Sequence, residues 1–255
     1  MEKKIMLGNE AIARGAYEAG VKVSSAYPGT PSTEISENIV KYPEIYAEWS
    51  PNEKVAMEVA IGASMSGARA LCSMKMVGVN VASDPLYTVS YIGVNGGLVL
   101  VAADDPGLYS SQNEQDSRCV ARVAQVPVLE PSDSSEAKEF TKLAFELSEK
   151  YDCPIMIRTT TRLAHSQGVV ELCDRVEVED KPYERCVPKN VMMPAMAKGR
   201  HVFVPLRTKQ FVLLAYFCLN WLDKTLEREA QATHATYALG TLTKEDVVAA
   251  IEKVV

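Results

Sequence analysis

The sequence lacks the features of several protein classes. Its longest apolar run, residues 211–222, is too short for a helix that spans a bilayer, so we expect no membrane segment. No leader of the secretory type opens the chain. The net charge of −6 is unsuited to a surface that binds nucleic acid through its phosphates. We therefore expect a cytoplasmic protein that binds neither nucleic acid nor a membrane.

Metal-binding patterns are also missing. The six cysteines lie at positions 72, 119, 153, 173, 186 and 218, and no two form a C-x-x-C pair. Scattered thiols of this kind are typical of reduced, buried side chains, not of a zinc site or an iron–sulfur cluster. The three histidines, at positions 165, 201 and 234, are isolated as well. We predict no metal site on this chain.

The pattern of apolar residues predicts an α/β fold. Predicted strands cover residues 21–27, 69–75, 97–102, 127–129 and 153–159, and predicted helices cover residues 9–19, 53–67, 79–92, 117–124 and a stretch that begins after Asp133. The strand at 97–102 is continuously apolar, as expected for a central parallel strand covered on both faces. Because strands and helices alternate with short connections, we predict a doubly wound, mostly parallel sheet.

The chain divides into three predicted parts. Its 255 residues suffice for one large domain plus an appendage. Residues 1–167 form the α/β domain in this prediction. Residues 168–204, which carry prolines and mixed charges, are predicted to be an extended arm. Residues 205–255 are predicted to be a helical appendage, with helices over about 209–232 and 243–251.

The predicted helix that begins at Glu53 is central to the functional hypothesis. Asn52 is a suitable N-cap, because its side chain can accept a hydrogen bond from the first turn. Glu53 lies where the helix dipole favours negative charge. Residues 60–67 are mostly alanine, glycine and serine, which allows another backbone to approach closely. We interpret Glu53 as a working carboxylate in a tight interface; the alternative is a favourable first-turn acid without chemistry.

Two further segments are predicted to meet Glu53, because ligands of open parallel sheets bind beyond the carboxyl ends of the strands. Residues 27–34 (Tyr-Pro-Gly-Thr-Pro-Ser-Thr-Glu) offer hydroxyls and a helix start, with Thr30 as the cap and Pro31 at the first helical position. Residues 104–118 are dense in amides, hydroxyls and acids. Plain helix capping and a solvated loop are the respective alternatives.

Four of these segments together resemble a known family. They are residues 27–34, 52–56 (Asn-Glu-Lys-Val-Ala), 62–64 (Gly-Ala-Ser) and 110–118. In this order they are similar to the pyrimidine-binding (Pyr) domain of thiamine-diphosphate-dependent 2-oxoacid:ferredoxin oxidoreductases, and especially to the alpha subunits of the indolepyruvate branch. The resemblance covers about residues 1–201.

The resemblance implies roles for individual residues. Glu53 would be the catalytic carboxylate that faces N1′ of the aminopyrimidine; by donating there, a carboxylic acid favours the imino tautomer, which can then take the proton from thiazolium C2. The implied cofactor-binding residues are Glu53, Pro28, Gly29 and Thr30. The implied substrate-side residues are Thr30, Asn113, Gln115 and Arg118. The family's substrate-reading arginine has no counterpart after Val101, where the chain continues Ala-Ala-Asp, and this favours a bulky aromatic 2-oxoacid.

Several features of the family are missing from this chain. Relatives bind magnesium and the diphosphate with a Gly-Asp-Gly stretch, which does not occur here, and cluster-binding cysteine runs are missing too. The resemblance therefore implies that thiamine diphosphate is shared with a partner domain or subunit. It also places Mg²⁺ and 4Fe–4S clusters on partners, and implies an oligomer with a beta or gamma-type subunit, ferredoxin as the electron acceptor and coenzyme A as the acyl acceptor.

Three functional hypotheses remain. The first is the Pyr-domain part of an enzyme that decarboxylates indolepyruvate, or another aryl pyruvate, oxidatively to an acyl-CoA. The second is a non-catalytic binding or assembly subunit, because motifs are missing and the sequence after Val204 departs from the family; a native ending, a gene-fission product or an altered reading frame would each explain that departure. The third is a nucleotide-binding Rossmann domain, which lacks support because no G-x-G-x-x-G follows the first strand.

Overall fold

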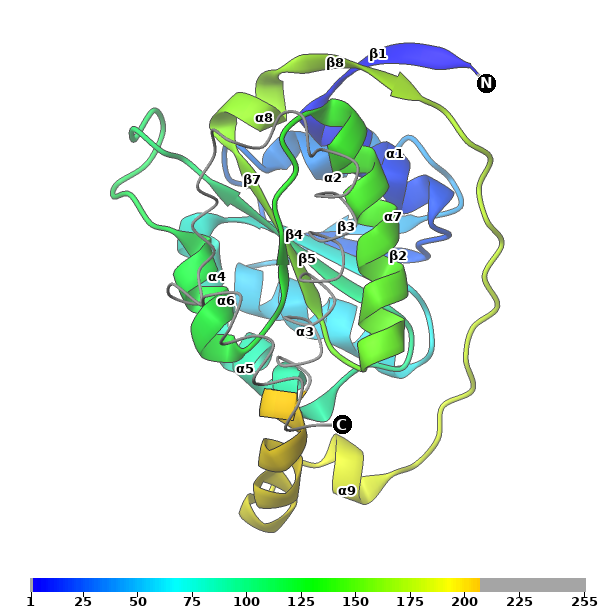
Figure 1. Cartoon of the computed structure of the whole chain (residues 1–255), viewed down its shortest axis with the longest axis vertical. Coiled ribbons are helices and arrows are strands. Elements are labelled where there is room, and N and C mark those ends of the chain that lie inside the picture. The colour runs from blue at the N-terminus through cyan, green and yellow to red at the C-terminus, as the bar shows by residue number, and fades with distance from the viewer. Residues whose placement is uncertain (1, 207–255) are drawn as a thin grey trace, which may run out of the picture.

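A six-stranded parallel sheet forms the centre of the molecule, which we describe from a computed structural model of residues 2–206 (Figure 1). The strand order is β3-β2-β4-β5-β7-β6, and each neighbouring pair is parallel. The strands are β2 (Val23–Ala26), β3 (Tyr46–Trp49), β4 (Ala70–Lys75), β5 (Leu98–Asp104), β6 (Val128–Leu129) and β7 (Ile155–Thr160). The predicted doubly wound parallel sheet is confirmed.

Helices cover both faces of this sheet. One face is covered by α1 (Gly8–Glu18), α2 (Thr33–Ile39) and α7 (Ser134–Tyr151). The other is covered by α3 (Glu53–Met65), α4 (Met76–Val81), α5 (Ser83–Ile92) and α6 (Ser117–Ala124). Successive residues of a strand point to opposite faces, so β5 contributes Val99 to the first apolar cluster and Leu100 to the second. Both lie fully buried, which explains the unbroken apolar run.

Side-chain caps fix where the helices begin. The Asn52 side chain accepts a hydrogen bond from the Val55 N–H at 3.0 Å, as predicted. Asp133 accepts from the Glu136 N–H at 2.9 Å, also as predicted, and the Glu136 carboxylate accepts in return from the Ser132 N–H at 2.8 Å. The Asn52 cap places Glu53, the first residue of α3, at a defined point beside the sheet edge.

Two local predictions were wrong. Thr30 does not cap the following helix, and Pro31 is not its first residue. A turn closed by the Ser32 N–H and the Gly29 carbonyl at 2.8 Å precedes the helix, so α2 begins at Thr33 with Ser32 as its N-cap. The predicted single helix over residues 79–92 is two helices, α4 and α5, which are separated at Ala82. Pro85 explains the break, because it lacks the N–H that a continuous helix needs and its ring would clash with the carbonyl four residues earlier.

A second, antiparallel ribbon ties the two ends of the α/β domain together. It pairs β1 (Lys3–Leu7) with β8 (Gln167–Glu171) and lies at one end of the molecule in Figure 1, after the short helix α8 (Thr161–His165). Neither strand was predicted. Both are short and expose most of their side chains, so they lack the apolar pattern by which a buried strand is found in a sequence.

The chain beyond β8 runs along one side of the domain to α9 (Val187–Asn190), and residues 194–206 are again helical (Figure 1). The Arg175 guanidinium donates to the carbonyls of Tyr17 and Val21 at 2.9 and 3.0 Å. At Gly67, whose φ is +100°, a Cβ would lie 1.8 Å from the Lys181 carbonyl oxygen. Gly67 therefore admits the backbone of this same chain. The division into three parts remains a prediction, and the helices predicted over 209–232 and 243–251 lie outside the described residues.

Within residues 2–206, no helix is both long and apolar enough to cross a bilayer.

A buried ion cluster joins α1, α7 and the segment after β8. The carboxylate of Glu18, which is fully buried, accepts from Arg14 Nε and from the Cys173 N–H, each at 2.8 Å, and lies 3.2 Å from Nζ of Lys138, which is only 1% exposed. Burial opposes ionisation of this carboxyl, but the hydrogen bonds from Arg14, Cys173 and Lys138 outweigh it and lower the pKa of Glu18.

We expect Glu18→Gln to lower the free energy of unfolding by about 3 kcal/mol at pH 7, because Lys138 would lose its buried counterion. Glu139→Gln is the control: this exposed carboxylate pairs with the same lysine at 2.8 Å, and its loss should cost less than about 1 kcal/mol. Denaturant unfolding measures both. The stabilisation from Glu18 is present above its unfolded pKa of about 4.5 and is lost as the pH falls through its lower folded pKa, so the difference between the wild type and Glu18→Gln should shrink on acidification. Equal effects of the two variants would contradict this assignment.

Candidate active site

The site lies where the chain changes direction in the sheet. After β2 the chain crosses to β3 on one side, and after β4 it crosses to β5 on the other, although β2 and β4 are neighbours. Open parallel sheets have a crevice at such a reversal, outside the carboxyl ends of the two strands, and ligands bind there. The loop that begins at Tyr27, the start of α3 and the turn from Lys75 into α4 therefore face the same position.

Glu53 is held against a notch in α4. A Cβ added to Gly78 would lie 2.5 Å from Cγ of Glu53 and 2.6 Å from its Oε1. Real Cβ atoms do not come this close, so only glycine at position 78 permits this placement of the half-buried carboxylate. Sequence reasoning missed Gly78, because nothing in a helix pattern indicates which distant side chain needs the space.

The Glu53 carboxylate has no hydrogen-bond or ion-pair partner within the described part of the chain. The neighbouring Lys54 does not neutralise it, because its ammonium group lies 3.0 Å from Asp84 and 3.9 Å from Glu58. Polar groups that are withdrawn from water normally have partners. A half-buried acid without one, at the edge where ligands bind, is suited to a hydrogen bond with a bound heterocycle.

The buried floor beside Glu53 is apolar and nearly neutral. Cys72 of β4 is fully buried, and this burial raises the pKa of its thiol to about 12; a hydrogen bond with Ser25 opposes the shift and the charge of Glu53 adds to it. The Ser25 hydroxyl donates to the Ala56 carbonyl at 2.6 Å and so links β2 to α3. Cys72 is therefore a neutral packing residue, and Cys153 is buried as well. Cys119 and Cys186 are exposed, so the prediction of buried thiols is wrong for these two.

The loop after β2 approaches β4 closely. A Cβ on Gly29 would lie 3.0 Å from Cβ of Lys75, so glycine at position 29 leaves room for the lysine side chain. The Gly29 N–H donates to the Thr33 hydroxyl at 2.9 Å. Pro28 and Thr30 are both exposed beside it. The structure thus gathers the predicted residues Pro28, Gly29 and Thr30 at the crevice, while their contact with a cofactor remains a prediction.

The loop after β5 is anchored by two consecutive aspartates at its start. Asp105, which is 1% exposed, accepts hydrogen bonds from the Ser110 N–H at 2.8 Å, the Ser111 hydroxyl at 2.6 Å and the Thr161 hydroxyl at 2.7 Å. Burial alone would raise the pKa of Asp105, but these bonds and the charge of Lys75 lower it to about 2. The loop is therefore fixed by a carboxylate that stays ionised.

The predicted substrate-side residues of this loop form hydrogen bonds and ion pairs with other side chains of the chain. Arg118 forms a forked contact with Asp116, with its Nη2 at 2.8 Å, and lies 3.4 Å from Glu130; the bonds with Asp116 raise the pKa of Arg118 although burial opposes this. Gln115 accepts from the Asn80 side chain at 2.9 Å and donates to Asn113 at 2.6 Å. Contact of Asn113, Gln115 or Arg118 with a substrate remains a prediction.

Arg158 of β7 links this loop to the neighbouring strands, and sequence reasoning missed it. Its Nε donates to Asp104 at 2.7 Å, and its Nη1 contacts Glu130. Asp104 also accepts from the Ser117 N–H at 3.1 Å, at the start of α6. Arg158 is 6% exposed. A buried arginine among these acids positions the loop and is not available to a ligand.

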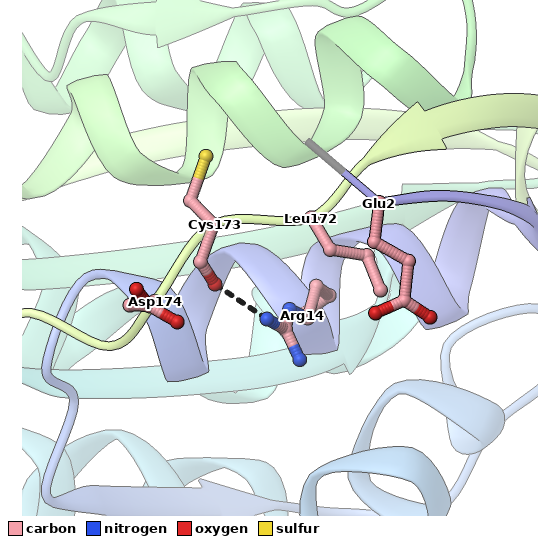
Figure 2. Close-up of a pocket in the computed structure, with 5 residues that line it drawn as sticks. All are labelled: Glu2, Arg14, Leu172, Cys173 and Asp174. Atoms are coloured by element: carbon pink, nitrogen blue, oxygen red, sulfur yellow. Dashed lines mark hydrogen bonds between the residues drawn. The ribbon is translucent and has the colours of Figure 1, made fainter.

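A surface hollow of about 500 Å³ lies elsewhere, against α1 and the chain after β8 (Figure 2). It is lined by Glu2, Arg14, Leu172, Cys173 and Asp174. Arg14, its only lining cation, donates to the Cys173 carbonyl at 2.5 Å and to Glu18 at 2.8 Å. The hollow contains no residue of the predicted site. Among the described residues, no three histidine, cysteine, aspartate or glutamate side chains are grouped as a metal ion would require.

Comparison of this sequence with known proteins agrees with the geometry of the site. Residues 14–212 match the family described as "Pyruvate flavodoxin/ferredoxin oxidoreductase, thiamine diP-bdg". The chain belongs to this family. Two relatives named "Indolepyruvate oxidoreductase subunit IorA" are 49% identical (Archaeoglobus fulgidus; 88% of this chain, 37% of the relative) and 55% identical (Pyrococcus abyssi; 67% and 27%). The chain thus spans about a third of the length of these relatives.

More distant similarity supports the same fold. "2-oxoglutarate synthase subunit KorA" of Methanocaldococcus jannaschii is 27% identical over 77% of this chain and 58% of its own length. A solved "2-oxoglutarate:ferredoxin oxidoreductase from Magnetococcus marinus with 2-oxoglutarate, coenzyme A and succinyl-CoA bound" superposes with a TM-score of 0.64 at 18% identity, over 82% of this chain and 45% of that one. The structural likeness shows a shared fold.

The site residues fit the aminopyrimidine end of thiamine diphosphate. The cofactor's ring needs a carboxyl group at one nitrogen and a flat, dry surface beside it. Glu53 offers a carboxylate without a protein partner among the described residues, and the Gly78 notch keeps it in place. The fit is to the pyrimidine end of the cofactor, and it rests on Glu53 and Gly78.

We expect Gly78→Ala to displace the Glu53 carboxylate with little loss of stability. The added methyl group occupies the space of the Glu53 side chain, which can rotate away, so the free energy of unfolding should change by less than about 1 kcal/mol. In an assembly that binds thiamine diphosphate, hydrogen–deuterium exchange at thiazolium C2 should slow by at least about tenfold.

Gly199→Ala is the control for this variant, because a Cβ at Gly199 meets no atom within 4 Å. Its exchange rate should equal that of the wild type. Wild-type exchange in Gly78→Ala would show that the position of Glu53 against α4 is not needed.

Proposed function

We propose that this chain is the Pyr-domain part of a thiamine-diphosphate-dependent 2-oxoacid:ferredoxin oxidoreductase that acts on indolepyruvate or another aryl pyruvate. The observation that carries the proposal is the unpartnered Glu53 carboxylate at the capped start of α3, held against Gly78 at the ligand-binding edge of the sheet. Membership of a thiamine-diphosphate-binding family and the names of the IorA relatives support it.

Each residue of the site has a task in this proposal. When bound, thiamine diphosphate supplies a nucleophilic carbon that makes loss of CO₂ from a 2-oxoacid possible. Glu53 exchanges a proton with N1′ of the pyrimidine and so controls which tautomer is present. Gly78 leaves the carboxyl group its space, and the buried Cys72 side of β4 excludes water from beneath it. Pro28, Gly29 and Thr30 border the ring.

The rest of the reaction is assigned to partners. A second domain or subunit would hold the diphosphate through Mg²⁺, and 4Fe–4S clusters there would carry electrons to ferredoxin while coenzyme A accepts the acyl group. This division rests on the Gly-Asp-Gly and cluster-binding cysteine runs, which do not occur in this sequence. An oligomer of several subunits is therefore part of the proposal.

Glu53→Gln should slow hydrogen–deuterium exchange at thiazolium C2 by about 100-fold or more in the assembled enzyme, because the amide cannot exchange a proton with N1′. Glu58→Gln, one turn later on α3, is the control. Among the described residues the exposed Glu58 carboxylate pairs with Lys54 alone, at 3.9 Å, so this variant should leave the rate unchanged. Nuclear magnetic resonance after acid quench measures the exchanged fraction. An unchanged rate in Glu53→Gln would refute the proposed role.

Calorimetry separates the enzyme from the alternative, a non-catalytic assembly subunit, which the missing Gly-Asp-Gly and cysteine runs favour. The chain alone should bind thiamine diphosphate and Mg²⁺ weakly, because the described residues provide only the pyrimidine side. Addition of the Gly-Asp-Gly partner should produce tight binding that Glu53→Gln weakens. Tight binding to the isolated chain would contradict the half-site, and no binding in any combination would favour the assembly subunit.

A further inference from the structure

The turn from β4 into α4 presents a buried lysine, Lys75, close to Glu53. Lys75 is the last residue of β4 and the N-cap of α4, and it is only 8% exposed. Its aliphatic stem lies against Gly29, in the loop after β2. Its Nζ donates to the Ser110 carbonyl at 2.5 Å, in the loop after β5. Lys75 therefore lies between the two loops that border the crevice.

The ammonium group of Lys75 is poorly compensated for a buried charge. It carries three N–H donors, yet the Ser110 carbonyl is its one hydrogen-bond acceptor among the described residues, and none of their carboxylates lies within 4.0 Å. The charge of Asp105 does interact with Lys75, but three donors from Ser110, Ser111 and Thr161 already occupy the Asp105 oxygens. A buried cation normally has a close anion.

The position of Lys75 indicates which anion would pair with its ammonium group. Lys75 and Gly78 lie within one turn, and Gly78 is where Glu53, and with it the pyrimidine end of the cofactor, is placed in the proposed function. In thiamine diphosphate the pyrimidine and the diphosphate are attached to opposite sides of the thiazolium ring. An anion near the pyrimidine end is therefore the substrate, whose carboxylate is bonded directly to the reacting carbonyl carbon.

We propose that Lys75 binds the carboxylate of the 2-oxoacid and so determines that an acid, not a neutral carbonyl compound, is the substrate. The lysine keeps its bond to the Ser110 carbonyl and uses its remaining donors for the carboxylate. Through Ser110, the same bond couples substrate binding to the loop after β5, which Asp105 fixes. This inference rests on the proposed function and names the group that recognises its substrate.

A pair of unreactive probes tests this inference by calorimetry on the chain assembled with its cofactor-binding partner. Indole-3-acetate has the aryl group and a carboxylate, whereas indole-3-acetamide is its neutral counterpart. Lys75→Met, which keeps most of the stem against Gly29, should weaken acetate binding by about 10- to 100-fold and leave acetamide binding unchanged. Lys75→Arg should keep most of the preference for the acetate. Lys41→Met, at an exposed lysine in the turn after α2, is the control and should bind both probes as the wild type does.

The outcomes separate this inference from the proposed function. Equal losses of acetate and acetamide binding in Lys75→Met would show a packing role and overturn it. Three other results would also overturn it. Lys75→Met could bind the acetate as tightly as the wild type does, or its only defect could be weaker binding of thiamine diphosphate. The wild-type assembly could also bind the acetate no more tightly than the acetamide. Exchange at thiazolium C2 should stay at the wild-type rate in Lys75→Met, whereas exchange that is insensitive to Glu53→Gln refutes the proposed function itself.

Discussion

The contact between the Glu53 carboxylate and Gly78 is the constraint on which the site depends. Asn52 fixes the first turn of α3, and the absence of a side chain at position 78 lets the acid rest against α4 beside the end of β4. The role proposed for this acid depends on that placement, and the contact with Gly78 shows how the side chain is held.

The remaining structure supplies a rigid edge for this contact. Arg158 and Asp104 bind the carboxyl ends of β7 and β5 together, and Asp105 orders the loop that follows. On the opposite face, the buried pair of Glu18 and Lys138 joins α1 to α7. Ionic groups are thus concentrated where loops and helices must be positioned, while most of the side chains buried in the sheet interior are apolar.

Much of this could be predicted from the sequence, because the decisive signals are local. Unbroken apolar runs gave the central strands, and Asn52 and Asp133 gave two helix starts. The wrong predictions concern positions where a nearby residue sets the start or the end of a helix. A turn closed by Ser32 replaces the cap expected at Thr30, and Pro85 divides the helix predicted after β4. The strands β1 and β8, the Gly78 notch and the Lys75 contacts depend on residues far apart in sequence, which no local pattern can indicate.

One measurement tests the central claim most directly: an experimental structure of the chain assembled with its partner, thiamine diphosphate and Mg²⁺. The account predicts a Glu53 carboxyl oxygen at a hydrogen-bond distance of about 2.6–3.2 Å from N1′ of the pyrimidine ring, with Gly78 in contact with the same side chain. A Glu53 side chain that points to solvent, or a ring nitrogen that is bound by another acid, would contradict it.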